Sequence, residues 1–339
     1  MNLAGFLIRR TIYMMMTLVA ISILVFLLTR VMPGDPAKLA LGNTATKEMV
    51  EKLREEMHLN DSLPIQYCKW IAGVFHGDFG RSYYSYRAVI VDVKEFLPAT
   101  LELVVFAVVV LTVAGIGFGV LAAAFKDRWI DQGIRVFAYA GVSIPYFLWG
   151  IFLLLIFGYF LDLLPTGGRL TYGLAAPMRI TGFYTIDGAL TGNWRVVGDA
   201  LKHLIMPVVS ISVGGLNLAA RITRAGMIDN QRADYIQVAQ SLNIPRRIIM
   251  AKYLLKPSVI PTVSLLGMEL GVLVSKAFLV ELIFNWPGIS RYGIAAMLNK
   301  DVNAITAVVL IVGVLYVGMN FVVDVAVGFL DPRTRLQQK

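Results

Sequence analysis

Two oppositely charged residues lie inside an otherwise apolar stretch of the sequence. Glu269 and Lys276 are seven residues apart, which places them on about the same face of a helix, two turns from one another. Charge inside an apolar stretch of this length is costly to bury and points to a function. The pair could line a pathway and contact a charged solute, or the two side chains could bind each other or a partner as a buried pair. We favour the second interpretation.

A second group of residues has the spacing of a short docking helix. In the polar loop 232–247, apolar residues recur at the intervals of one helical face, namely Tyr235, Val238, Ala239 and Leu242. Asn243 follows where a helix end favours a left-handed residue, and Pro245 prevents continuation. So short a helix is poorly stable alone. It either docks into a groove of a partner or packs beneath the rest of the chain, and the residues leave both open.

Residues for catalysis or for binding a metal are not evident in the sequence. It contains no phosphate-binding loop of the form G-x-x-x-x-G-K-[ST], and no Ser–His or paired-carboxylate constellation. The histidines His58, His76 and His203 are dispersed, without the spacing of metal ligands. We therefore expect this chain to have no catalytic residue, no cofactor and no metal of its own.

The elements that carry these residues are apolar segments of membrane-spanning length. Of the 339 residues, 57% are hydrophobic and only 16% are charged, whereas soluble domains contain about 25% charged residues. About 20 apolar residues cross a bilayer, and the sequence predicts six such spans, at 11–29, 103–125, 136–161, 204–220, 262–284 and 305–323. The fourth is short and requires Lys202 and His203 to reach the membrane interface. Pro145 and Pro207 predict kinks in the third and fourth spans. The fold class is an all-α membrane protein.

The distribution of charge predicts the orientation. With six spans both termini lie on one side, and that side carries most of the excess of Lys and Arg behind the net charge of +9. The large segments 31–98 and 162–200 on the other side are nearly balanced. Positively charged segments stay on the cytoplasmic side. We therefore expect a protein of the plasma (inner) membrane with both termini in the cytoplasm. The basic charge is then a topology signal, and we expect no nucleic-acid partner.

The chain divides into four parts. Residues 1–30 form the cytoplasmic N-terminus and the first span, and 31–98 form an outer module with amphipathic helices at 47–57 and from 61–64 to Gly77. Residues 99–330 form a five-span core with a cytoplasmic loop at 225–258, and 331–339 form a tail. The outer module is a structural lid or a docking surface for an external partner, and the sequence does not decide between them.

Several segments together resemble one family. The loop residues Tyr235, Ile236, Ala239, Asn243 and Pro261 match the cytoplasmic motif of ABC importer permeases of the peptide and nickel branch, with Asn243 in place of the usual glycine. The segments 31–36, 77–83, 164–168, 281–289 and 331–333 match the same branch, in order along nearly the whole chain. The sequence is therefore similar to the B-type permease subunit of dipeptide and oligopeptide importers.

The resemblance implies a fold, a function and a set of partners. The fold is that of a type I ABC importer permease with a small helical extracytoplasmic module. The partners are a second homologous permease, two ATPase subunits that hold ATP and Mg, an extracytoplasmic substrate-binding protein, a peptide substrate and membrane lipid. The residues assigned to ATPase coupling are Asp234, Tyr235, Val238, Ala239, Leu242 and Asn243, and those assigned to extracytoplasmic docking are Asp78, Arg81 and Trp286. Glu269 and Lys276 are assigned to the translocation pathway because of their charge within a span, and not because of the resemblance, since related permeases usually carry a neutral or small residue there.

Three other functions are weighed against peptide import. A nickel or other small-solute importer of the same branch would share all of these motifs. A carrier driven by an ion gradient would use the intramembrane charges and the prolines, but it does not explain the docking loop. An intramembrane hydrolase lacks its catalytic residues in this sequence.

Overall fold

The computed structural model describes residues 3–31, 46–56 and 59–330. Within these ranges the chain is helical, and its only extended pairing is an isolated bridge between Arg81 and Ala88. The helices at the outer end, opposite α10, and at its margins are α3 (Lys47–Glu56), α4 (Leu63–Phe75), α8 (Tyr184–Leu190) and α13 (Ile289–Leu298). The long helices of the bundle are α1 (Leu3–Val31), α5 (Val89–Ala124), α9 (Trp194–Asn230), α12 (Leu255–Ile283) and α14 (Val302–Leu330). The remaining helices are α6 (Trp129–Ser143), α7 (Tyr146–Leu153), α10 (Asp234–Ser241) and α11 (Arg246–Ile248), with π-helical turns η1 (Leu154–Phe160) and η2 (Ile249–Leu254).

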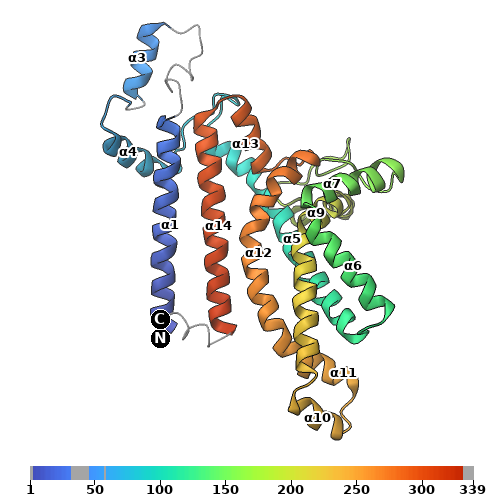
Figure 1. Cartoon of the computed structure of the whole chain (residues 1–339). Helices are drawn as coiled ribbons and strands as arrows, with labels where there is room; N and C mark the ends of the chain where they lie inside the picture. The colour runs from blue at the N-terminus through green and yellow to red at the C-terminus, as the bar shows by residue number, and fades with distance from the viewer. Residues whose placement is uncertain (1–2, 32–45, 57–58, 331–339) are drawn as a thin grey trace.

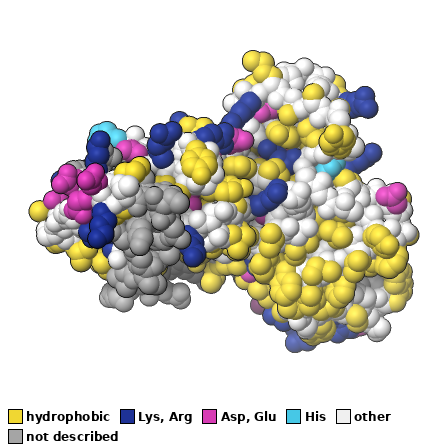
Figure 2. Space-filling model, turned by 90° about the horizontal axis from the view of Figure 1, so that it is seen from above, with side chains coloured by type: hydrophobic (Ala, Val, Ile, Leu, Met, Phe, Trp, Pro, Cys, Tyr) yellow, Lys and Arg dark blue, Asp and Glu magenta, His cyan; other side chains and the backbone are white. Residues whose placement is uncertain are grey.

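The long helices form a bundle with short helices at both ends. In Figure 1, α1, α14 and α12 stand side by side, α13 and the α3–α4 module lie at one end, and α10 and α11 project from the other. The first turn of α1 and the last turn of α14 lie toward the end that carries α10 (Figure 1). Figure 2 looks onto the opposite end, and hydrophobic side chains cover large parts of the molecule in this view. An apolar outer surface of this kind suits lipid or another subunit.

The number of candidate spans agrees with the six predicted from the sequence, with one qualification in geometry. In the described residues, five helices are long and apolar enough to cross a membrane, and a bent pair adds a sixth if it is counted as one span. That pair, α6 with α7 and η1, is bent by 111°. The predicted single kinked span 136–161 is therefore two helices at a sharp angle.

Pro145 explains the break in the third span. A proline disfavours helical geometry in the residue before it, and Ile144 is extended, with φ −92° and ψ 127°. Pro145 itself precedes α7 as its N-cap. The second half then packs across α9, where Ser210 Oγ donates a hydrogen bond to the backbone oxygen of Tyr146 at 2.9 Å.

The fourth span corrects the sequence prediction in length and in the role of His203. α9 has 37 residues and is the central helix, packed by α5, α12, α6, α7 and α8. His203 is buried, and its Nδ1 lies 3.0 Å from the backbone oxygen of Asp199. From the sequence we expected His203 to reach the membrane interface. It does not, because α9 begins two turns before His203 and encloses it in the helix. Asn193 caps that start by accepting a hydrogen bond from the Val196 amide.

The outer module contains the two predicted amphipathic helices, but its C-terminal boundary differs from the predicted one. α3 and α4 lie close to the predicted amphipathic helices, and Pro64 occupies the first turn of α4. Tyr67 of α4 joins the module to α1 through a 2.8 Å hydrogen bond with Ser22. α5 begins at Val89 and passes through Pro98, so the predicted module boundary at 98 falls within a helix. Residues 32–36, His58 and the tail 331–339 lie outside the described residues.

Candidate functional site

The loop between α9 and α12 contains the predicted helix and turn. α10 spans Asp234–Ser241, and Asn243 has φ +52°, the left-handed conformation that the sequence predicts. The amide of Asn243 donates to the carbonyl of Gln240 at 2.9 Å, and the amide of Ile244 donates to that of Ala239 at 3.1 Å. This is the Schellman pattern of a helix C-terminus, which satisfies two otherwise unpaired carbonyls. Asparagine is thus sufficient for a turn that usually uses glycine.

The apolar residues of α10 do not form the single stripe that the sequence predicts. Ala239 is buried together with Ile236, against a cluster of this chain's own side chains that includes Ala123, Met227 and Leu254. Ala239 is therefore a packing residue inside the subunit, and its predicted place on the outer docking face is wrong. The prediction used helical spacing alone. That spacing is compatible with Ala239 on the exposed face or on the buried face, and the prediction did not consider Ile236, which shares the buried face with Ala239.

A second, outward face of α10 is largely exposed, and the polar contact that joins it to α9 is a 3.4 Å hydrogen bond from the Tyr235 hydroxyl to Asn230 Oδ1. Tyr235, Val238 and Leu242 are 44%, 58% and 70% exposed. Asp234 lies exposed in the first turn, where a carboxylate is favoured by the helix dipole. The helix therefore combines an anchored inner face with an apolar outer face at the end of the bundle (Figure 1).

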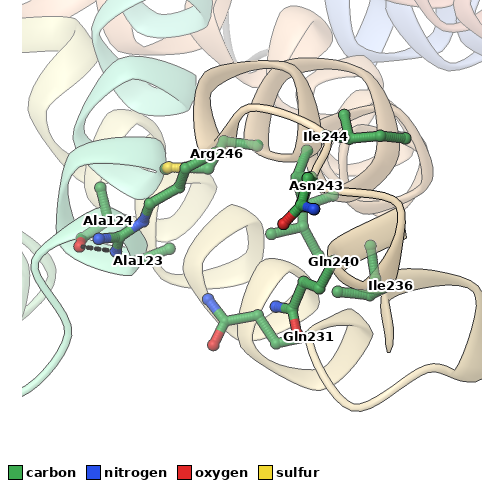
Figure 3. A pocket seen from close by; sticks show the side chains of 11 residues that line it. Ala123, Ala124, Gln231, Ile236, Gln240, Asn243, Ile244 and Arg246 are labelled. Atoms are coloured by element: carbon green, nitrogen blue, oxygen red, sulfur yellow. Dashed lines mark hydrogen bonds between the residues drawn. The ribbon is translucent and has the colours of Figure 1, made fainter. Parts of the chain in front are cut away.

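A pocket of about 520 Å³ separates α10 from the end of α5 (Figure 3). It is lined by polar and apolar side chains of the loop, among them Gln231, Ile236, Gln240, Asn243 and Ile244. Arg246 reaches across it and donates from Nη2 to the backbone oxygen of Ala124 at 3.2 Å. This contact ties the loop to α5, so the position of α10 depends on α5 as well as on α9 and α12.

The charged residues of the fifth span bind each other. Lys276 Nζ lies 2.9 Å from Glu269 Oε2, and each side chain is about four-fifths buried. Glu269 packs against Gly215 of α9, where an added Cβ would come within 3.0 Å of Oε2. The geometry agrees with the favoured interpretation of a mutual pair. The assignment of Glu269 and Lys276 to a pathway stays a prediction.

The three residues predicted to dock an external partner are separated by their burial. Asp78 and Arg81 are exposed; Asp78 accepts a hydrogen bond from the Gly80 amide at 2.9 Å, and Arg81 donates to the carbonyl of Tyr86 at 3.2 Å. Trp286 is 1% exposed, and its Nε1 donates to the carbonyl of Ala99 at 2.9 Å. The docking role predicted for Trp286 is therefore wrong, because its ring packs in the core beside α5.

Asp301 holds the Asp78–Arg81 region in place. Its Oδ2 accepts hydrogen bonds from Ser82 Oγ at 2.5 Å, from the Tyr83 amide at 2.8 Å and from the Tyr84 amide at 3.1 Å. Burial, with the charge of Asp301 beside it, raises the pKa of the Tyr83 hydroxyl. The exposed turn is thus fixed to the start of α14.

A buried polar cluster that sequence reasoning missed closes the outer end. Arg169 Nη2 lies 2.6 Å from Glu102 Oε2 and 2.8 Å from the carbonyl of Gly182. The other carboxylate oxygen of Glu102 accepts from the amide and hydroxyl of Thr185 at 2.9 and 2.7 Å. The Arg169 guanidinium also lies 3.6 Å from the centroid of the Tyr184 ring. These contacts fasten the long loop after η1 to α5 and to α8.

Asp187 organises the same loop from the other side. Its carboxylate accepts hydrogen bonds from the amides of Ile180, Thr181 and Gly182 and from the Thr181 hydroxyl, all between 2.7 and 3.2 Å. Burial opposes ionisation, and the hydrogen bonds from Thr181, Gly182 and Ile180 together outweigh it, so the pKa of Asp187 lies below its ordinary value. The loop that leads into α8 is therefore held in one conformation.

No cluster of metal-ligand side chains occurs in the described part of the chain: no group of three or more His, Cys, Asp or Glu is placed to hold an ion. The arrangement instead offers an exposed apolar helix at one end, a fixed polar turn at the other, and an ion pair between. None of these positions a nucleophile with a general base.

Comparison with known proteins accounts for this arrangement. The family model for the binding-protein-dependent transport system inner membrane component matches residues 115–336, and the model for the N-terminal part of such components matches residues 3–104. The probable D,D-dipeptide transport system permease protein of Escherichia coli K12 is 34% identical over 94% of this chain and 94% of its own length. The dipeptide transport system permease protein of the same organism is 33% identical, with 97% and 98% covered.

A third relative comes from another organism. The dipeptide transport system permease protein of Alkalihalophilus pseudofirmus is 30% identical over 96% of this chain and 98% of its own length. The two family models together match residues 3–104 and 115–336, and the likeness to the relatives runs over nearly the full length of the chain. The chain belongs to the family of binding-protein-dependent transport system inner membrane components, as a multi-pass membrane permease subunit.

Proposed function

We propose that this chain is one of two permease subunits of an ATP-driven importer of dipeptides or oligopeptides. The outward face of α10 carries the proposal: Tyr235, Val238 and Leu242 are exposed at the end of the bundle while the other face of the same helix is anchored. Full burial of such a side chain is worth about 1.5–3 kcal/mol, so this face favours a partner. The relatives named for dipeptide transport support peptides as the substrate class.

The partner of α10 in this proposal is an ATPase subunit. A second homologous permease completes the pathway, two ATPases bind ATP and Mg, and an external binding protein delivers the peptide near Asp78 and Arg81. The excess of basic residues at the α10 end supports a cytoplasmic location for this end and for both termini. ATP binding would draw the ATPases together and move α10 with them, and the bundle would alternate between inward and outward access by rigid-body motion.

The test is ATP-dependent uptake of labelled dipeptide into vesicles that contain the reconstituted complex. Val238→Glu and Leu242→Glu each put a charge on the outward face, while Gln237→Glu adds the same charge at the adjacent exposed polar position as a matched control. We expect uptake to fall about tenfold or more in Val238→Glu and in Leu242→Glu, which is equivalent to about 1.4 kcal/mol of lost coupling free energy. We also expect the ATPase subunit to dissociate from the complex in both variants. The control should stay near wild type.

Three results would contradict parts of this proposal. Normal uptake and assembly in both apolar variants would remove the coupling role of α10. Uptake of nickel or another small solute, with no peptide transported, would assign the chain to a nickel or small-solute importer of the same branch. Transport by this chain alone, indifferent to ATP, would indicate a gradient-driven carrier.

A further inference from the structure

A cavity between α6 and α9 contains a buried amide without a partner. The cavity has a volume of about 160 Å³, and its walls include Asn217, Ala138 and Ala220. Asn217 is 1% exposed, and among the residues that the structure describes neither its Oδ1 nor its Nδ2 has a hydrogen-bond partner. α6 comes close enough to enclose the amide because Gly141 has no side chain: an added Cβ there would overlap Asn217 Nδ2. A buried amide left unpaired costs about 1–3 kcal/mol, so a ligand in the cavity would relieve it.

The same cavity is strongly basic. Arg135, Arg221 and Arg224 all line it. Arg224 makes a bidentate pair with Asp131 at 2.6 and 2.7 Å, and Arg135 lies 3.7 Å from the same carboxylate. Arg221 has no ion pair within the described ranges. Three guanidinium groups thus line the cavity, and the nearby carboxylates are Asp131, paired with Arg224 and Arg135, and Asp127, which also acts on Arg224. One positive charge is left over beside the unpaired amide.

The cavity lies toward the α10 end of the bundle, near the end of α9 and the start of α6. Arg221 is nine residues before the end of α9 at Asn230, and Arg135 is six residues after the start of α6; at 1.5 Å per residue these are roughly 14 and 9 Å from those ends. The flank of α6 beside the opening is apolar and exposed, with Trp129, Val136 and Val142 at its surface. A ligand here meets positive charge inside and hydrocarbon-compatible side chains outside.

We propose that this cavity binds the headgroup of an anionic phospholipid, such as phosphatidylglycerol, from the leaflet on the α10 side. Guanidinium groups are the preferred partners of phosphate oxygens, and Arg221 is available for this contact. The amide of Asn217 donates to a phosphate or glycerol oxygen, and its carbonyl accepts from a glycerol hydroxyl. Basic pockets between spanning helices on the cytoplasmic side suit such headgroups, and the apolar flank of α6 carries the acyl chains.

Native mass spectrometry of the full-length chain tests the proposal. The protein is extracted from phosphatidylcholine vesicles that contain phosphatidylglycerol, and the retained phosphatidylglycerol is counted. Arg221→Gln should reduce retention by about tenfold or more, since it removes a charge-assisted hydrogen bond to the phosphate, and Arg221→Lys should retain an intermediate amount. The control Arg232→Gln removes an exposed charge at the same end outside the cavity and should retain as much as wild type.

Any of three outcomes overturns the proposal. Equal loss in Arg221→Gln and Arg232→Gln would mean adsorption by net charge, without a site. Displacement of the lipid by millimolar inorganic phosphate or by a free peptide would assign the cavity to a soluble anion. Loss of phosphatidylglycerol once the second permease is bound would assign this face to the subunit interface.

Discussion

Replacement of Arg169 by methionine should destabilise the outer end of this permease more than any exposed substitution in the same loop. The variant keeps the length and apolar stem of the side chain but removes its charge. Glu102, which is 1% exposed, would retain its two hydrogen bonds from Thr185 and lose the ion pair with Arg169. An ionised carboxylate at that depth has no water to replace the guanidinium.

The magnitude follows from the contacts that are lost. Removing one partner of a buried ion pair costs about 3–5 kcal/mol, and the guanidinium stacked 3.6 Å from the Tyr184 ring centroid adds about 1 kcal/mol. A loss of 1 kcal/mol lowers the unfolding temperature by about 2–4 °C in chains of about 150–250 residues and by less in longer ones. At about 2 °C per kcal/mol for this chain of 339 residues, the unfolding temperature should fall by roughly 10 °C. In the double variant Glu102→Gln/Arg169→Met no charge is left buried, so more than half of this loss should be recovered.

Thermal unfolding of the purified subunit in detergent gives the shift, and hydrogen exchange of residues 162–183 locates it. Arg179→Met is the matched control, because Arg179 lies in the same loop, is exposed and donates only to the carbonyl of Lys94. Equal shifts for Arg169→Met and Arg179→Met would refute the reasoning. So would a double variant as unstable as the single one, because the cost would then come from packing and not from an unpaired charge.

Three further predictions concern the loop turn, acid stability and the intramembrane pair. Asn243→Val, at φ +52°, should lower stability by about 1–2 kcal/mol and weaken complex assembly, while Asn243→Gly is neutral in thermal unfolding; identical behaviour of the two would argue against the left-handed turn. Asp187 has a lowered pKa in the folded state, so its contribution is complete above its unfolded pKa and is lost as the pH falls through its folded pKa; Asp187→Asn should flatten the acid side of the stability–pH profile, and an unchanged profile would count against it. Lys276→Met should destabilise the subunit by leaving Glu269 unpaired, and Glu269→Gln/Lys276→Met should restore stability; peptide uptake that is normal in the double variant would exclude a pathway role for both.

The sequence was sufficient to locate the spans but not to delimit the helices. The length of an apolar run reports only the part of a helix that crosses the hydrocarbon core. The helix itself continues until its backbone is capped or broken. α9 therefore begins at Trp194, behind the cap at Asn193, and not at the first run of apolar residues. The extended residue before Pro145 could be anticipated as a bend. Its angle of 111° depends on the packing of α7 across α9, which sequence spacing does not contain.

The candidate site was predictable where it is local and not where it depends on contacts distant in the sequence. The helix of α10 and its turn at Asn243 follow from neighbouring residues and were confirmed. The burial of Ala239 depends on Ala123 and Met227, which are distant in the sequence. Trp286 was predicted to dock an external partner, but its ring packs in the core, where its Nε1 donates to the carbonyl of Ala99, nearly two hundred residues away in the sequence. Arg169 and Glu102 are 67 residues apart, and no local pattern pairs them.

The length of α9 has a mechanical consequence. With 37 residues at 1.5 Å each, the helix is about 55 Å long, and a tilt of about 10° around its middle would carry each end about 5 Å, in opposite directions. α10 follows its lower end after only three residues, and the Arg169 cluster and α8 lie beside its upper end. A small displacement of α10 would therefore tilt α9 as a rigid lever. The same tilt would widen the bundle at one end and narrow it at the other.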